Sequence, residues 1–302
     1  MLRQILLLLP LFVTTAFAQT AVGTAAPFAR SNAKSDTVRT SSTRAATLDS
    51  IRLAQDSILA HAHSRVALDS SAVDELEKIA MIYKERKRFA MQLQIAMRMT
   101  ETNPASALAH LVYGDALLDN DQPERAIAAL SRALVIAPNY VRARVMLAET
   151  FEILQKPDSA MAQLDTALLH NPRHANAHMQ LAKLLTKRGQ HAEAADHYRT
   201  ACELLPDAPS SYGPWMKLAD ALIANYAYTE AIDALRYCMR LQPTSPDPYL
   251  LMAEVHEKSG DTSKAIRAYL DFSLRFPTDD RALDAERAAL RLRYPSASTV
   301  PD

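Results

Sequence analysis

Apolar residues recur at helical spacing along most of this chain, in pairs of short segments that each end at a proline. The clearest pair is 141–172, with the sequence VRARVMLAETFEILQKPDSAMAQLDTALLHNP. Its apolar and small residues share one face before the turn at Lys156-Pro157 and one face after it: Val145, Leu147, Ala148 and Phe151, then Ala160, Leu164, Ala167 and Leu168. Because residues three or four apart share a face of an α-helix, this pattern predicts a helical hairpin that ends at Pro172.

The hairpin pattern occurs five times in register. The prolines that bound these units are spaced by 34, 34, 34, 37 and 34 residues: Pro104, Pro138, Pro172, Pro206, Pro243 and Pro277. Small residues recur in both helices, at Gly114, Ala148, Ala182, Ala219 and Ala253, and at Ala126, Ala160, Ala194, Ala231 and Ala265. Small side chains let facing helices approach, and one hairpin cannot bury its apolar face alone. The sequence therefore predicts an all-α fold in which hairpins stack into a solenoid.

The residues that recur at these aligned positions resemble those of the tetratricopeptide repeat (TPR) family, and the resemblance covers 107–277. The family has a bulky residue at one position of the first helix, and we call this aligned position the bulky column. In this chain the bulky column holds Trp215 and Tyr249, whereas three units depart from the family with His110, Arg144 and His178. The resemblance implies a right-handed superhelical solenoid of tetratricopeptide helix-turn-helix hairpins, with five TPR units in 107–277.

The segments that flank these units fit the pattern less closely. We predict a degenerate TPR at 71–104, because Gln92 stands where the alanine is expected. The segment 278–293 is predicted to be a C-terminal capping helix, and 294–302 a loose tail. The apolar residues of the capping helix are Leu283, Ala285, Ala289 and Leu290.

The spacing of 37 comes from three extra residues, Pro209-Ser210-Ser211, between the third and fourth units. We interpret them as a loop insertion, because loops accept extra residues at little entropic cost. A hinge, or a changed superhelical step, is the alternative.

The first residues are typical of a bacterial Sec-type signal peptide, which we assign to 1–18. A positive start at Arg3 precedes an apolar run from Ile5 to Val13, and Ala16-Phe17-Ala18 offers a cleavage site of the small-x-small type. The run is too short to cross a bilayer as a helix. We therefore expect an exported protein, periplasmic or secreted, with no transmembrane segment in the mature chain.

Two further segments precede the repeats. Residues 19–45 are rich in Ser, Thr and Ala and have no apolar period, so we expect a flexible linker. The spacing of Leu48, Ile51 and Ile58 indicates an amphipathic helix within an N-terminal helical segment at 46–70.

Charge and cysteine content exclude some classes of function. Lys plus Arg and Asp plus Glu number 34 each, so there is no net positive charge to favour nucleic acid as a partner. The two cysteines, Cys202 and Cys238, lie among apolar neighbours and are expected to be small buried side chains. A disulfide between them remains an open alternative.

The sequence contains few candidates for catalytic residues. His170, His174 and His178 are spaced by four, but Pro172 separates the first two, so the three do not share one helix. The basic run from Lys84 to Arg88 is interpreted as a solvated helix end and turn. No phosphate-binding loop, nucleophile elbow or H-E-x-x-H pattern occurs. We predict no enzyme, no catalytic or metal-binding residue and no cofactor.

A partner-binding groove is implied by the resemblance, since first helices line the concave face of TPR solenoids. Its apolar positions here are Leu111, Val145, Met179, Met216 and Leu250. Four residues further on, hence on the same face, are Asp115, Glu149, Lys183, Asp220 and Glu254. The alternative is that the apolar set belongs partly to the core and the charged set only solubilises the chain.

The leading hypothesis is a non-enzymatic scaffold or adaptor in the cell envelope, which binds a protein or peptide segment in this groove. The family's carboxylate clamp is not matched, because apolar residues stand at its Lys position and acids at its Asn position. A self-assembling or complex-building structural subunit is the second hypothesis. A metal-dependent envelope enzyme that uses the histidines is the third.

Overall fold

The computed structural model describes residues 56–59, 73–205 and 207–294. The predicted signal peptide (1–18), the linker (19–45), most of the segment 46–70 and all but the first residue of the tail (294–302) lie outside these ranges. Of the segment 46–70, residues 56–59 are helical. Every element below belongs to the unit Ser57–Asp302.

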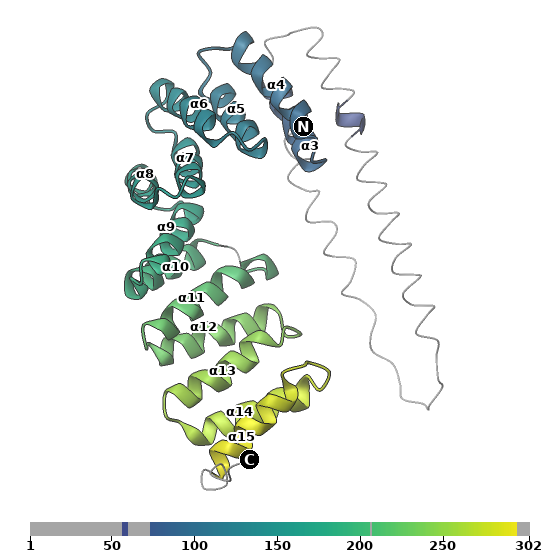
Figure 1. Cartoon of the computed structure of the whole chain (residues 1–302), viewed down its shortest axis with the longest axis vertical. Coiled ribbons are helices and arrows are strands. Elements are labelled where there is room, and N and C mark those ends of the chain that lie inside the picture. Colours follow the sequence, from purple (N-terminus) through teal and green to yellow (C-terminus); the bar gives the residue numbers. More distant parts are fainter. Residues whose placement is uncertain (1–55, 60–72, 206, 295–302) are drawn as a thin grey trace, which may run out of the picture. The chain divides into compact units, whose positions relative to one another are not determined.

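The described part of the chain consists of helices, turns and loops and contains no strand. Helices follow one another in pairs joined by short turns (Figure 1). They are α3 (Val73–Glu85), α4 (Phe89–Thr102), α5 (Ala107–Asp119), α6 (Pro123–Ile136), α7 (Val141–Ile153), α8 (Pro157–His170), α9 (Ala175–Lys187), α10 (His191–Leu204), α11 (Tyr212–Ala224), α12 (Tyr228–Leu241), α13 (Asp247–Lys258), α14 (Thr262–Arg275) and α15 (Ala282–Arg293). None of these helices is long and apolar enough to span a bilayer.

Each helix packs chiefly on its neighbours in the chain, within its own pair and across to the next pair. First helices of successive pairs also touch, as α3 touches α5 and α5 touches α7. The repeated small residues make these contacts, since Ala148, Ala160 and Ala167 are buried. At Gly114 a Cβ atom would lie 2.7 Å from Leu130 of α6, so that pair leaves no room for a methyl group. The predicted all-α repeat solenoid is confirmed.

The turn inside each pair has one geometry. It contains a residue with positive φ, and these residues recur at the repeat spacing: Lys87, Asp121, Gln155, Gly189, Tyr226 and Gly260. The amide of the next residue donates to a carbonyl five residues earlier, as Lys156 N does to Phe151 O at 2.8 Å. This is the Schellman closure of a helix. The segment that we predicted to be degenerate has the same turn, and its Gln92 is buried and donates to Asp119 at 2.9 Å.

Polar side chains in the bulky column form hydrogen bonds with the end of the preceding unit. His110 Nε2 lies 3.0 Å from the carbonyl oxygen of Pro104, and His178 Nε2 lies 3.0 Å from that of Pro172. Two other units repeat this contact across the same six residues: Arg144 to Pro138 at 2.8 Å and Tyr249 to Pro243 at 3.3 Å. A carbonyl oxygen only accepts, so each of these side chains donates. The residues that depart from the family pattern therefore satisfy the carbonyl of the preceding proline.

The structure differs from prediction at the capping helix. Helix α15 turns Ala282, Ala285 and Ala289 inward, whereas Leu283 and Leu290 are each 56% exposed. Of the four apolar residues named from the sequence, only Ala285 and Ala289 lie on the buried face, because the inward residues follow a spacing of three and four that excludes the two leucines.

The three inserted residues form a short 3-10 turn, η2 (Pro209–Ser211), that leads directly into α11. Arg240 of α12 reaches Asp207 at 3.3 Å, and Gln242 donates to Pro209 O at 3.3 Å. The insertion is thus held against the end of α12.

Candidate functional site: the cleft between α7 and α9

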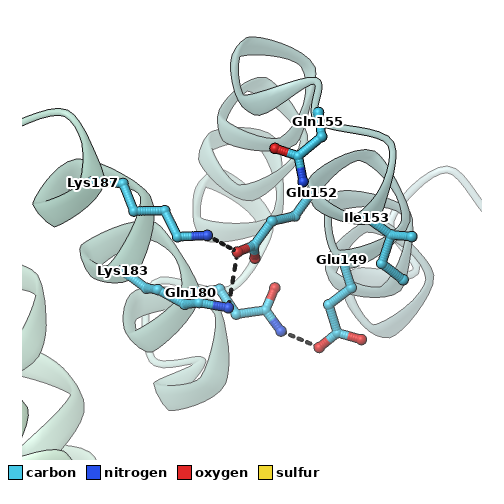
Figure 2. A pocket seen from close by; sticks show the side chains of 7 residues that line it. All are labelled: Glu149, Glu152, Ile153, Gln155, Gln180, Lys183 and Lys187. Atoms are coloured by element: carbon cyan, nitrogen blue, oxygen red, sulfur yellow. Dashed lines mark hydrogen bonds and ion pairs between the residues drawn. The ribbon is translucent and has the colours of Figure 1, made fainter.

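A cleft of about 460 Å³ lies between α7 and α9, the first helices of two successive pairs (Figure 2). Its lining residues come from the second half of α7 with the turn after it and from α9: Glu149, Glu152, Ile153, Gln155, Gln180, Lys183 and Lys187. On each helix they fall at spacings of three and four, so each set forms one row that faces the other helix.

Paired polar contacts join the two rows. Glu152 accepts from Lys183 at 2.8 Å and from Lys187 at 2.5 Å. One turn earlier, the side-chain amide of Gln180 donates to Glu149. Ile153 projects beside them and is 58% exposed. The cleft therefore combines an apolar side chain, two ammonium groups, two carboxylates and amide groups within a short distance.

The two carboxylates differ in their acid–base behaviour. Burial raises the pKa of Glu149, the negative charges of Asp115 and Glu152 add to this, and the Gln180 hydrogen bond and Lys84 only partly oppose it. Burial also acts to raise the pKa of Glu152, but hydrogen bonds and charge from Lys183 and Lys187 outweigh it and lower that pKa. Glu152 is thus the firmly ionised member of the pair.

Of the ten predicted groove residues, the structure brings only Glu149 and Lys183 into this cleft. Asp220 is exposed and lies 3.5 Å from Lys217, and Glu254 is partly buried. Three apolar members of the set are half-buried and packed against the core: Met179, Met216 and Leu250.

Two predicted groove residues are not accessible to a partner. Leu111 and Val145 are 0% and 4% exposed, respectively, and are part of the core. Their prediction as exposed groove residues is wrong, because first helices of successive pairs pack on one another and cover these positions. A continuous apolar stripe is therefore not formed at that end, and Ile153, which we did not predict, is the exposed apolar side chain in the cleft.

Asp115 is engaged within the protein. Lys84 of α3 lies 2.7 Å from Asp115 and 3.0 Å from Asp119. Burial lowers the pKa of Lys84, but the hydrogen bonds and charges of the two carboxylates outweigh it and raise that pKa overall. Lys84 is in the last turn of α3, so the predicted helix end and turn are confirmed. This lysine is also a structural cation, because it pairs with two carboxylates of α5.

The histidines are used in local contacts. His174 accepts at Nδ1 from the Ala177 amide at 3.1 Å and so caps α9. His178 Nδ1 lies 2.9 Å from His197 Nδ1 on α10. Among the described residues, no group of three or more His, Cys, Asp or Glu is arranged to hold a metal ion.

Cys202 and Cys238 are free and buried. Burial raises the pKa of each thiol to about 12, which keeps it protonated at neutral pH. The expectation of small buried side chains is confirmed.

Comparison with known proteins gives matches to one repeat family. Family models of the tetratricopeptide repeat match residues 107–150, 145–209 and 222–290, which together cover more than half of the chain. No curated protein matches the sequence.

Several solved structures share the fold. The C-terminal part of a TPR repeat-containing protein from Cytophaga hutchinsonii has a TM-score of 0.60 and 14% identity, over 80% of this chain and 98% of that one. YrrB, described as a TPR protein with an unusual peptide-binding site, has a TM-score of 0.54 and 17% identity, over 64% and 97%. The APC/C hetero-tetramer Cut9-Hcn1 has a TM-score of 0.55 and 15% identity, over 78% of this chain, which spans 46% of the matched chain.

Proposed function

Because the chain belongs to the tetratricopeptide repeat family, we propose that it is a non-enzymatic scaffold that binds a protein or peptide segment in the α7–α9 cleft. Stacked helical repeats present extended surfaces to protein partners. The similar YrrB structure is described as having a peptide-binding site, and this supports a peptide-sized ligand.

The observation that carries the assignment is the exposed Ile153 beside the paired groups of the cleft. A cleft that places an apolar side chain among a few hydrogen-bonding and charged groups has the composition of a ligand site. Gln155 and Gln180 can exchange hydrogen bonds with a peptide backbone, and Lys187 can pair with an acidic side chain. The partner segment then has one apolar side chain that covers Ile153, flanked by polar groups.

The matched pair Ile153→Ser and Leu169→Ser tests this assignment. Both leave one fewer exposed apolar side chain, but Leu169 lies on α8 outside the cleft and is 79% exposed. Partners are captured from native cells on the wild-type chain, identified by mass spectrometry, and then titrated against each purified variant. We expect Ile153→Ser to weaken partner binding about tenfold, since 1.4 kcal/mol corresponds to a factor of ten, and Leu169→Ser to leave it unchanged. Equal affinities for both variants would exclude the cleft.

The proposal also places the scaffold in the cell envelope, supported by the signal-like sequence of 1–18. Fractionation of the native cell with amino-terminal sequencing tests this point. We expect a mature chain that begins at Gln19 outside the cytoplasm; a cytoplasmic chain that retains Met1 would contradict it.

A second candidate, a self-assembling or complex-building subunit, is favoured by the apolar surface of the last two helices. Leu274 of α14 is 79% exposed, and Leu283 and Leu290 of α15 add to it. Sedimentation over a range of concentrations distinguishes the candidates, because a strictly monomeric chain does not self-assemble.

A further inference from the structure

A second cleft, of about 320 Å³, lies among α4, α5 and α6 and is separate from the α7–α9 cleft. Its lining residues are Thr100, His110, Tyr113, Arg125, Ala128, Ala129 and Arg132. None of them is acidic, and two are arginines. The cleft therefore has a positive charge that its own lining does not neutralise.

One wall of this cleft is Ala129, at a repeat position where the next two units carry a larger side chain. In the next two units, the second-helix residue at this position meets the bulky-column residue: Arg144 with Gln163 at 3.4 Å, and His178 with His197 at 2.9 Å. In the fourth unit this position is Ala234, and Trp215 instead stacks on Tyr237, which takes the place of Arg132. By the repeat spacing, Ala129 takes the place of Gln163 and His197. His110 meanwhile turns to the Pro104 carbonyl. The small Ala129 side chain leaves open the space that Gln163 and His197 take up in the next two units.

The two arginines have no carboxylate partner among the described residues. Arg125 donates to the Tyr113 hydroxyl at 3.0 Å and to Gln122, and both acceptors are neutral. Arg132 makes no hydrogen bond or ion pair with any residue that the structure describes. Since Tyr113 accepts from Arg125, its own proton remains available to a ligand oxygen.

The repeat fold does not require this pair of arginines. The residues that replace Arg125 and Arg132 in the other units are Ser159 and Thr166, Glu193 and Thr200, Glu230 and Tyr237, and Lys264 and Asp271. No other unit combines two positive charges at these positions with a small residue at the position of Ala129. The charge and the space therefore coincide in one unit.

We propose that this cleft binds an acidic segment of a partner protein, with one carboxylate at Arg125 and a second at Arg132. Guanidinium groups bind carboxylates through paired hydrogen bonds. Arg125 and Arg132 are seven residues apart on α6, which places their Cα atoms about 10 Å apart along its axis. In a polyproline II segment, which has three residues per turn, side chains three residues apart share a face and are separated by about 9 Å. One small inorganic anion does not span this distance.

Fluorescence anisotropy with the full chain tests the proposal. The probe is a fluorescein-labelled Gly/Ser peptide with two glutamates three residues apart, and its matched control has glutamines instead. We expect the glutamate peptide to bind at least tenfold more tightly. Arg132→Gln removes an unpaired charge and Ala129→Gln fills the cleft with the residue found at position 163, so each should weaken binding about tenfold. Arg267→Gln, an exposed and unpaired arginine of α14, should have no effect.

Four results would overturn the proposal. They are equal affinity for the two peptides, equal loss in Arg132→Gln and Arg267→Gln, wild-type affinity in Ala129→Gln, and displacement of the peptide by equimolar inorganic phosphate. The last would indicate a small-anion site only. Circular dichroism verifies that each variant is folded; should Ala129→Gln unfold, Arg132→Gln decides alone, because its side chain is exposed and has no partner in the described chain.

Discussion

The contacts of His178 fix where its proton lies. Its Nε2 donates to the Pro172 carbonyl, so its Nδ1 accepts, and the hydrogen between His178 and His197 belongs to His197 Nδ1. The two rings cannot both be charged without losing this bond. Burial and the nearby His178 lower the pKa of His197, although Asp165, Asp196 and Glu193 act to raise it.

Acidification should therefore weaken this unit. A His pKa that is depressed in the folded chain gives stability that is complete above the ordinary value of about 6.5 and is lost as the pH falls through the folded value. We expect the free energy of unfolding to fall more in the wild type than in His197→Gln between about pH 7.5 and about pH 5. Urea denaturation at both pH values measures this difference, and parallel changes in the two proteins would contradict it.

Glu149 and Glu152 should respond oppositely to neutralisation. The pKa of Glu149 is raised, so its stabilising contribution is present below the unfolded pKa and is lost as the pH rises through the folded one. At neutral pH, Glu149→Gln should then gain up to about 1 kcal/mol, and the gain should vanish in acid. Glu152→Gln, which loses contacts with two lysines, should be destabilised at neutral pH. Thermal melts of both variants at two pH values are the measurement, and a common sign at neutral pH would contradict it.

The cleft could be predicted only in part from the sequence. The family resemblance indicates that Glu149 and Lys183 lie on first helices, and both do line the cleft. It does not indicate which turns of α7 and α9 face one another, and that register decides the roles of Glu152 and Lys187. The exposure of Ile153 depends on how far two helices separate at their ends, which single-helix periodicity does not report.

At the level of the helical hairpin, the positive-φ residue is the common structural feature of the turns. Two of the six are glycines, and four are Lys87, Asp121, Gln155 and Tyr226. A side chain in this left-handed region costs roughly 1–2 kcal/mol relative to the right-handed region. The packing of the surrounding helices must offset this cost at each of the four turns.

Lys87→Gly should therefore stabilise the protein by up to about 1 kcal/mol, since Lys87 is exposed and glycine adopts positive φ without strain. Gly189→Ala is the matched reverse change. A Cβ at Gly189 meets nothing within 4 Å, so its expected loss of about 1 kcal/mol reports the backbone alone. Chemical denaturation of both variants measures the effects; a loss in Lys87→Gly would show that this turn is not strained.

The proline column was predictable from the sequence and the positive-φ column was not. Proline has one backbone role, and its spacing is visible in the letters alone. Lysine, glutamine and tyrosine at the turn carry no comparable signal, although Gly189 and Gly260 lie in register with them. Gln92 illustrates the same limit, because its partner Asp119 lies on another hairpin.

On the scale of the whole described chain, contacts are local. Helices touch their neighbours along the chain, and the buried residues form several clusters, of which the largest runs from α7 to α13. The largest cluster includes Leu164 and Leu235, whereas Leu76 and Phe272 belong to two others. In such a linear array, stability is close to a sum of unit and interface contributions.

Leu164→Ala should thus act regionally. Removal of this fully buried side chain should cost about 2–5 kcal/mol in its own cluster. Hydrogen exchange followed by mass spectrometry should show faster exchange in α7–α10 and little change in α14 and α15. Leu76→Ala provides the comparison at the other end, with its effect confined to α3–α5. Uniform loss of protection in either variant would indicate a single cooperative unit instead.

The turn at Pro209–Ser211 is a position at which the polypeptide chain can be divided. Pro209 and Ser210 are exposed, and the helices on both sides keep the repeat spacing although this joint is three residues longer. Exposed joints of this kind accept new chain ends. We therefore expect that two fragments divided at Ser210 and produced together would reassemble into the native fold.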